Sequence, residues 1–150
     1  MVSREALWVL NSTVSDDGAT VLLLHRLDRA SLGDEQIITI PDAISDADLA
    51  LGDRVWVGAG RADASGQGKL YAFGLDGSAY DPVTIARPVA LSAGARWLWV
   101  ASGDGSVEAV SVNLEGRLAP LTVGQGATDL AVVGTVVWIA SDQLVILAEP

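Results

Sequence analysis

The densest group of side chains that could do chemistry is a run of aspartates in the segment 42–48. Asp42, Asp46 and Asp48 stand there, and Asp129 recurs before a similar apolar triplet later in the chain. Carboxylate oxygens are the ligands that Ca²⁺ prefers, so these four aspartates form the predicted metal site. The EF-hand pattern is absent, and an Asx turn explains Asp46 and Asp48 equally well. A Ca²⁺ site and a structural turn therefore both stay open.

His25 is the single histidine, and so the one side chain that normally titrates near neutral pH. In an alignment of the internal repeats it takes the place of Phe73, Val110 and Leu147, which favours a half-buried structural histidine. A second histidine, a cysteine and a Gly-x-Ser-x-Gly elbow are all absent, so no nucleophilic triad is indicated. Among nineteen acidic residues, spacing singles out no pair for acid–base catalysis. We therefore predict no catalytic residue.

Polar connections are the better candidates for ligand binding. The segment 59–68 (AGRADASGQG) is an enlarged, glycine-rich loop, but a strand-like run follows it where a phosphate loop needs a helix. Loops on a rigid scaffold are where binding residues concentrate. The predicted ligand-binding residues lie in this loop, in the equivalent turns, in the connection between two repeats that holds Arg87, and on one exposed aromatic: Asp16, Asp17, Arg61, Asp63, Arg87, Trp97, Asp104 and Asp142.

Composition and charge narrow the classes of function. The 150 residues are 50% hydrophobic and carry nine basic against nineteen acidic side chains, a net charge of −10. Binding of nucleic acid needs a basic footprint, so we expect none. No apolar run approaches the roughly 20 residues of a membrane span, and the N-terminus lacks a signal-peptide pattern. We expect a soluble protein, cytoplasmic or periplasmic, which prefers cationic partners.

The elements that must position these residues are short and repeated. Trp8, Trp56, Trp99 and Trp138 each lie in a similar apolar segment, about 40 residues apart. Runs of β-branched, aromatic and Leu residues follow each Trp and precede the last three, and Gly, Asp, Asn, Ser or Pro bound them. That pattern predicts strands, four to a repeat, as in the blades of a β-propeller. A β-sandwich would leave the repeated Trp register unexplained.

The repeats predict an all-β chain of about fourteen short strands in roughly four blades. Numbered from the axis outward, the strands run 2-3-4, 1-2-3-4, 1-2-3-4 and 1-2-3. We expect the four tryptophans to fill equivalent layers between blades, and Trp97 to be an exposed or interface aromatic. Four blades form a small ring, half of a larger ring closed by a second copy, or an arc of a longer chain. The expected blades of this single domain span residues 1–41, 42–87, 88–124 and 125–150.

Two stretches carry a family resemblance. Gly52–Gly58 followed by Gly68–Phe73, and Leu98–Gly105 continuing into Val107, resemble the repeats of bacterial quinoprotein-like (PQQ-repeat) and YVTN-type propellers. The resemblance implies the propeller architecture and not an activity, because the quinone site of such enzymes has no counterpart here. The turn Ser102–Val107 is also similar to WD40 blades, but their Gly-His and Trp-Asp signatures are missing.

These patterns favour a non-catalytic propeller that binds a protein or small molecule. Its rim would be built from the connections between second and third strands and between successive blades. The alternative is a metal-dependent hydrolase similar to propeller lactonases, with its site in the central channel. That enzyme needs converging Glu, Asn and Asp side chains, and the innermost strands offer chiefly Asp48 and Asp129.

Overall fold

The computed structural model describes residues 6–40, 45–60, 66–124 and 126–149, apart from the side chains of residues 45 and 46. Within these residues the chain forms fourteen strands in four antiparallel sheets and no helix. The prediction of an all-β chain of about four blades is therefore confirmed. No helix among the described residues is long and apolar enough to cross a membrane. Asp42, Arg61 and Asp63 lie outside the described residues.

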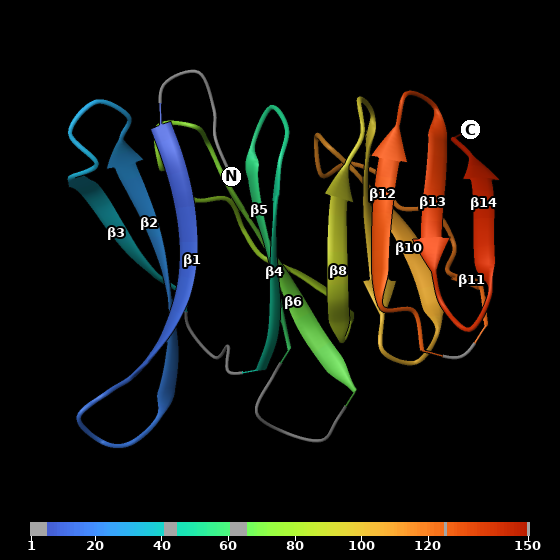
Figure 1. The fold of residues 1–150 in the computed structure, drawn as a ribbon, viewed down its shortest axis with the longest axis horizontal. Helices are drawn as coiled ribbons and strands as arrows, with labels where there is room; N and C mark the ends of the chain where they lie inside the picture. The colour runs from blue at the N-terminus through green and yellow to red at the C-terminus, as the bar shows by residue number, and fades with distance from the viewer. Residues whose placement is uncertain (1–5, 41–44, 61–65, 125, 150) are drawn as a thin grey trace.

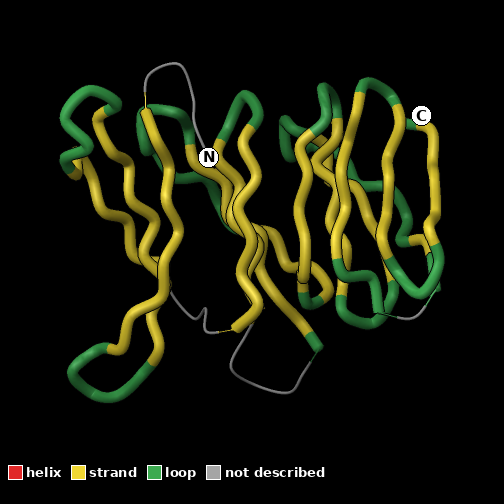
Figure 2. The backbone as a smooth tube through the Cα atoms, in the orientation of Figure 1, coloured by secondary structure: helices red, strands yellow, loops and turns green. Residues whose placement is uncertain are grey.

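The four sheets follow one another along the chain and stand side by side (Figures 1 and 2). The first holds β1 (Ala6–Val14), β2 (Thr20–Asp28) and β3 (Asp34–Ile40). The second holds β4 (Ser45–Leu51), β5 (Val55–Gly60), β6 (Gln67–Phe73) and β7 (Val83–Ala86). The third holds β8 (Pro88–Ala93), β9 (Trp97–Ser102), β10 (Ser106–Ser111) and β11 (Leu121–Thr122). The fourth holds β12 (Asp129–Val133), β13 (Val136–Ala140) and β14 (Leu144–Ala148).

Each sheet is a blade whose strands are hydrogen-bonded in chain order. The first strands of the last three blades, β4, β8 and β12, contact one another in succession and so lie innermost. β5 is buried along its whole length, as a strand covered on both faces requires. The alternation of side chains sends one face of a blade against the preceding blade and the other against the following one. Three separate cores result, one at each junction between blades.

Three of the four repeated tryptophans lie in these cores, and the fourth does not. Trp8 and Trp56 are fully buried and Trp99 is 3% exposed, each on the face turned toward the following blade. Trp138 is 40% exposed. The prediction that all four occupy equivalent layers is therefore wrong for Trp138, because no described blade follows the fourth one. Trp97 is half-buried and packs at the margin of the third core.

Polar bonds join neighbouring blades along their inner strands. The Asp48 carboxylate on β4 accepts the N–H of Leu91 on β8 at 2.7 Å, and its other oxygen accepts the N–H of Leu49 at 2.8 Å. The Ser92 hydroxyl on β8 accepts the N–H of Val132 on β12 at 3.1 Å. These bonds fix the inner strands of successive blades relative to one another.

One end of the molecule gathers the connections in which the ligand-binding residues were predicted. The turns β1–β2, β9–β10 and β13–β14 lie at the lower end in Figure 1, and Arg87, bonded through its backbone to Gly66 and Gly103, lies at the same end. We call this end the rim. The remaining turns, such as β2–β3, β6–β7 and β10–β11, lie at the opposite end.

Candidate functional site

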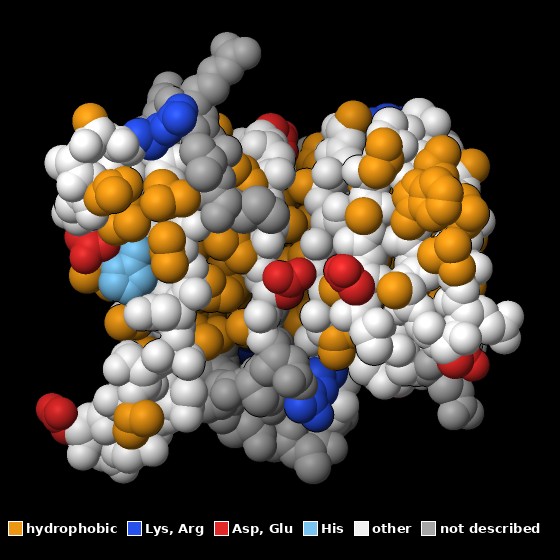
Figure 3. Space-filling model, in the orientation of Figure 1, with side chains coloured by type: hydrophobic (Ala, Val, Ile, Leu, Met, Phe, Trp, Pro, Cys, Tyr) orange, Lys and Arg blue, Asp and Glu red, His pale blue; other side chains and the backbone are white. Residues whose placement is uncertain are grey.

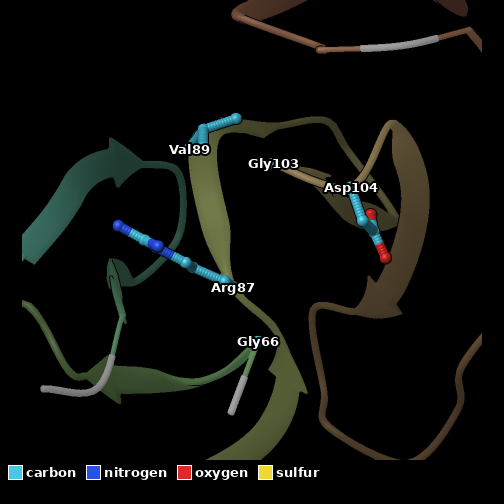
Figure 4. A pocket seen from close by; sticks show the side chains of 5 residues that line it. All are labelled: Gly66, Arg87, Val89, Gly103 and Asp104. Carbon is cyan, nitrogen blue, oxygen red and sulfur yellow. The ribbon is translucent and has the colours of Figure 1, made fainter. Parts of the chain in front are cut away.

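A pocket of about 450 Å³ opens on the rim where the second and third blades meet. Gly66, Arg87, Val89, Gly103 and Asp104 line it (Figure 4). They come from three connections, β5–β6, β7–β8 and β9–β10, and from the start of β8. Arg87 and Asp104 are two of the residues predicted to bind a ligand.

The backbone of Arg87 holds the three connections together. Its N–H donates to the carbonyl of Gly66 at 3.0 Å, and its own carbonyl accepts the N–H of Gly103 at 3.1 Å. Close packing beside it depends on Gly68, where an added Cβ would lie 2.5 Å from Pro88 Cδ. Contacts under about 3 Å are not met by real Cβ atoms, so only glycine permits this approach. The floor of the pocket is therefore set by backbone bonds.

Asp104 sits in a tight turn that keeps its carboxylate ionised. One carboxylate oxygen accepts the Ser106 hydroxyl at 2.6 Å and the Ser106 N–H at 2.9 Å, and these bonds lower the pKa of Asp104 below 3.8. Gly105 completes the turn with φ of 83°. Figure 4 shows the Arg87 side chain extending away from Asp104. The pocket thus presents a positive and a negative group that point in different directions.

Three further predicted residues lie on the rim in other blades. Asp16 and Asp17 are exposed in the β1–β2 turn, and Asp142 is exposed in the β13–β14 turn. The Ser15 hydroxyl and the N–H of Ala19 donate to Asp17 and lower its pKa. The structure therefore spreads these carboxylates along one end of the molecule and does not gather them in the pocket.

Trp97 lies at the opposite end and belongs to a different surface. It lines a second hollow of about 420 Å³ with Arg96 and Glu115, beside the β8–β9 turn. His25 is also away from the rim turns, on the face of the first blade that points away from the second. Its Nδ1 lies 2.9 Å from an Asp34 oxygen and its Nε2 lies 3.2 Å from Asn11 Oδ1. Both ring nitrogens of this half-buried histidine thus have partners.

Of the four predicted metal ligands, Asp48 and Asp129 are those whose side chains the structure describes. Asp129 accepts the N–H of Leu130 at 2.8 Å, as Asp48 does with Leu49, so the two have matching conformations on different blades. Asp42 and the side chain of Asp46 lie outside the described residues. No three His, Cys, Asp or Glu side chains among the described residues could share an ion. Asp48 is instead an acceptor of backbone bonds.

Sequence reasoning did not single out three residues that line the pocket. Val89 reads as one more apolar residue of an inner strand. Gly66 and Gly103 read as turn residues, although both lie in the loops that were predicted to bind. The repeat itself could have pointed to them. Equivalent blades must place the β5–β6 and β9–β10 turns at the same end of the molecule, so residues of the two turns lie near each other.

The sequence matches no protein-family model and no curated protein. Solved structures of β-propeller proteins are nevertheless similar to it. Hydrazine synthase of Kuenenia stuttgartiensis superposes with a TM-score of 0.67 at 10% identity, over 91% of this chain and 57% of that one. BamB of Moraxella catarrhalis superposes with a TM-score of 0.63 at 18% identity, over 91% of this chain and 41% of that one. The Pan2 WD40 domain of Neurospora crassa superposes with a TM-score of 0.62 at 10% identity, over 93% of this chain and 46% of that one.

At identities of 10–18%, these structural similarities establish the fold alone. The chain spans between 41% and 57% of the length of the three proteins. Its four antiparallel sheets, packed face to face with their first strands innermost, are blades of the same kind. The chain is a partial β-propeller of about four blades.

Proposed function

We propose that this chain is a non-catalytic propeller module that binds a cationic protein segment at its rim. The observation that supports the proposal most directly is the pocket between the second and third blades, where Arg87 and Asp104 stand on a backbone framework. Propeller domains among the structural neighbours accord with a scaffold or binding role. The short motifs of Gly52–Gly58 and Leu98–Gly105 favour blades of the bacterial quinoprotein-like and YVTN-type kind.

The charges at the rim favour a partner of opposite sign. Asp16, Asp17, Asp104 and Asp142 are exposed there, and the chain as a whole carries a net charge of −10. Asp17 and Asp104 have lowered pKa values, so both are ionised at neutral pH. A Lys or Arg side chain of the partner would pair with such carboxylates, while the Arg87 guanidinium would donate to a carbonyl or carboxylate oxygen of the same segment.

A hydrolase in the central channel is not proposed. It requires carboxylates that converge on one metal, and the described residues hold no such group. Asp48, the inner-strand candidate, already accepts two backbone N–H groups.

The test uses a fluorescent ten-residue peptide of alternating Lys and Gly, with a Glu-for-Lys peptide as its control. Fluorescence anisotropy should show binding of the basic peptide only. Its affinity should fall steeply between low and 0.5 M salt, because exposed charges are screened. Asp104→Asn should weaken binding by about two- to fivefold, the range of an exposed ion pair.

Asp76→Asn is the matched control for Asp104→Asn. Asp76 sits in a turn of the same design, where it accepts the hydroxyl and N–H of Ser78, but at the opposite end of the molecule. Its substitution should leave the affinity unchanged. Equal binding of the basic and acidic peptides, or equal effects of the two Asn variants, would refute an acidic binding rim.

A further inference from the structure

The fourth blade has one covered face and one bare face. Leu130, Val137 and Ile139 pack against the third blade, whereas the alternating positions point outward. On that outward face Trp138 is 40%, Ile146 52% and Leu144 65% exposed. Figure 3 shows the resulting cluster of hydrophobic side chains over the C-terminal sheet, at the right of the view. A contiguous apolar surface of this kind marks an interaction site.

The other junctions in the chain show what covers such a face. Trp56 pairs across its sheet with Ala50 and Ala72, and Trp138 takes the same place between Ala131 and Ile146. The following blade covers Trp56 completely, through apolar side chains of its first three strands: Leu91, Leu98, Val100 and Val110. The repeat therefore indicates that the natural cover of Trp138 is another blade.

Asp129 is a second and independent sign of a missing neighbour. Asp48 uses one carboxylate oxygen to accept the N–H of the next residue and the other to accept an N–H of the following blade. Asp129 makes the first of these bonds in the same way. Its position corresponds to the one from which Asp48 reaches across, but no described blade follows it. A hollow of about 130 Å³ lies between Asp129, Trp138, Ala140 and Leu144.

The opposite end of the arc presents the complementary surface. In the first blade Trp8, Leu22 and Leu24 face the second blade, and the alternate positions face away from it. Those positions are mostly apolar, with Val9 38% and Ile37 53% exposed. They are completed by half-buried side chains of β1 and β2: Leu7, Leu23, His25 and Leu27.

In the repeat, this outward surface of the first blade corresponds to a surface that is buried between blades elsewhere in the chain. Leu7 and Val9 flank Trp8 as Val55 and Val57 flank Trp56. Val55 and Val57 are fully buried against the first blade. The bare face of the first blade is thus built to receive the Trp face of a preceding blade.

We propose that a second copy of this chain covers both surfaces. Its first blade would pack on the Trp138 face, and its own Trp138 face on the first blade of the original copy. One chain carries both halves of the contact, so the assembly is head-to-tail, and two equal seams close it into a ring of about eight blades. Each chain spans 41–57% of the length of three proteins that it resembles, so two copies supply about as many residues as one of those chains.

The decisive measurement is the mass in solution of the 150-residue chain, by light scattering after gel filtration. The expected mass is twice that of one chain. Trp138→Asp and Ile146→Lys on the fourth blade, or Val9→Asp on the first, should each give monomers, because a charge would be buried in both seams. Leu121→Asp is the control, since Leu121 is 48% exposed on an internal blade, and it should stay dimeric. Circular dichroism confirms that each variant is folded.

Mixing the two classes of variant tests the head-to-tail geometry. An equimolar mixture of Trp138→Asp and Val9→Asp chains has one unaltered seam per pair, and should recover dimers that neither variant forms alone. A symmetric contact between two Trp138 faces would instead be unaffected by Val9→Asp and not rescued by mixing. That result, or a monomeric unaltered chain at tens of micromolar, as a longer parent chain would give, overturns the proposal. Peptide binding at the rim is measured separately, so the two proposals fail independently.

Discussion

Individual aspartates hold many of the turns of this protein together. Asp17, Asp28, Asp76 and Asp104 each accept hydrogen bonds from a residue two or three positions away, in turns at both ends of the blades. These bonds stabilise the ionised carboxylate and lower the pKa of all four groups below 3.8. Each of these carboxylates therefore uses one oxygen, Oδ1, to hold its own turn.

Folding stability should therefore depend on pH in the acidic range. A carboxyl whose pKa is lower in the folded state contributes stability above its unfolded pKa and loses that contribution as pH falls through its folded pKa. We expect the free energy of unfolding to be nearly constant between about pH 5 and 7 and to decline below about pH 4. Urea unfolding at a series of pH values measures this.

The variant Asp76→Asn tests whether turn aspartates cause this loss of stability in acid. Asp76→Asn keeps an oxygen that accepts the Ser78 bonds but cannot be protonated. The decline in unfolding free energy below pH 4 should become shallower in this variant. An unchanged slope would assign the acid sensitivity to other groups.

Loss of the Asp48 carboxylate should destabilise the junction between the second and third blades. Asp48→Ala leaves the N–H of Leu91 without its acceptor at the junction of two blades. We expect the free energy of unfolding to fall by about 1–3 kcal/mol, measured by urea denaturation. Asp142→Ala, at an exposed turn, is the control and should change stability by less than about 0.5 kcal/mol. Equal losses in both variants would contradict the role given to the inter-blade bond.

At the scale of strands, an ion pair on the third blade links that blade to the outer strand of the second. Glu108 on β10 is 2% exposed and accepts the Arg117 Nε–H at 2.6 Å. Arg117 also donates to the carbonyl of Thr84 on β7 at 3.0 Å, and Glu108 accepts the N–H of Ala86 at 3.4 Å. One pair thus satisfies backbone groups of a neighbouring blade.

Removal of the cation from this pair should be strongly destabilising. Arg117→Met would leave the Glu108 carboxylate buried without its partner, and the expected loss is about 3 kcal/mol of unfolding free energy. Chemical denaturation measures the loss, with Arg96→Met at an exposed turn as the control. The double variant Glu108→Leu, Arg117→Met should recover part of the stability, because no unpaired charge remains. A double variant as unstable as Arg117→Met would contradict this account.

The strands themselves were predictable because their signals are local. Alternating β-branched residues and the Gly, Asp and Ser turns predict each strand, and the Trp repeat predicts their grouping into four sheets. Glu108 was not predictable in the same way, since its alternation places it beside Val110 and nothing nearby in sequence indicates the distant Arg117. The pocket on the rim likewise depends on Arg87 meeting Gly66 and Gly103, which is a contact between three connections.

At the scale of the whole molecule, repetition is both the basis of the prediction and its limit. The repeat makes Trp138 equivalent to Trp56 by sequence, yet a residue is buried only where a neighbour exists to bury it. An arc of blades has two ends, and sequence periodicity alone does not say where they fall. Trp138 at one end and Val9 and Ile37 at the other are exposed for that reason.

The stability of the assembled ring should depend on concentration. A dimer whose ends cover each other is favoured by mass action, so its melting temperature rises as the chain concentration is raised. We expect a rise on the order of 2–4 °C for each tenfold increase, measured by calorimetry from about 5 to 500 µM. Trp138→Asp, which opens both seams, should melt at a lower temperature that is the same at every concentration. If the melting temperature of the unaltered chain does not change with concentration, the outward faces that hold Trp138 and Val9 stay uncovered in solution.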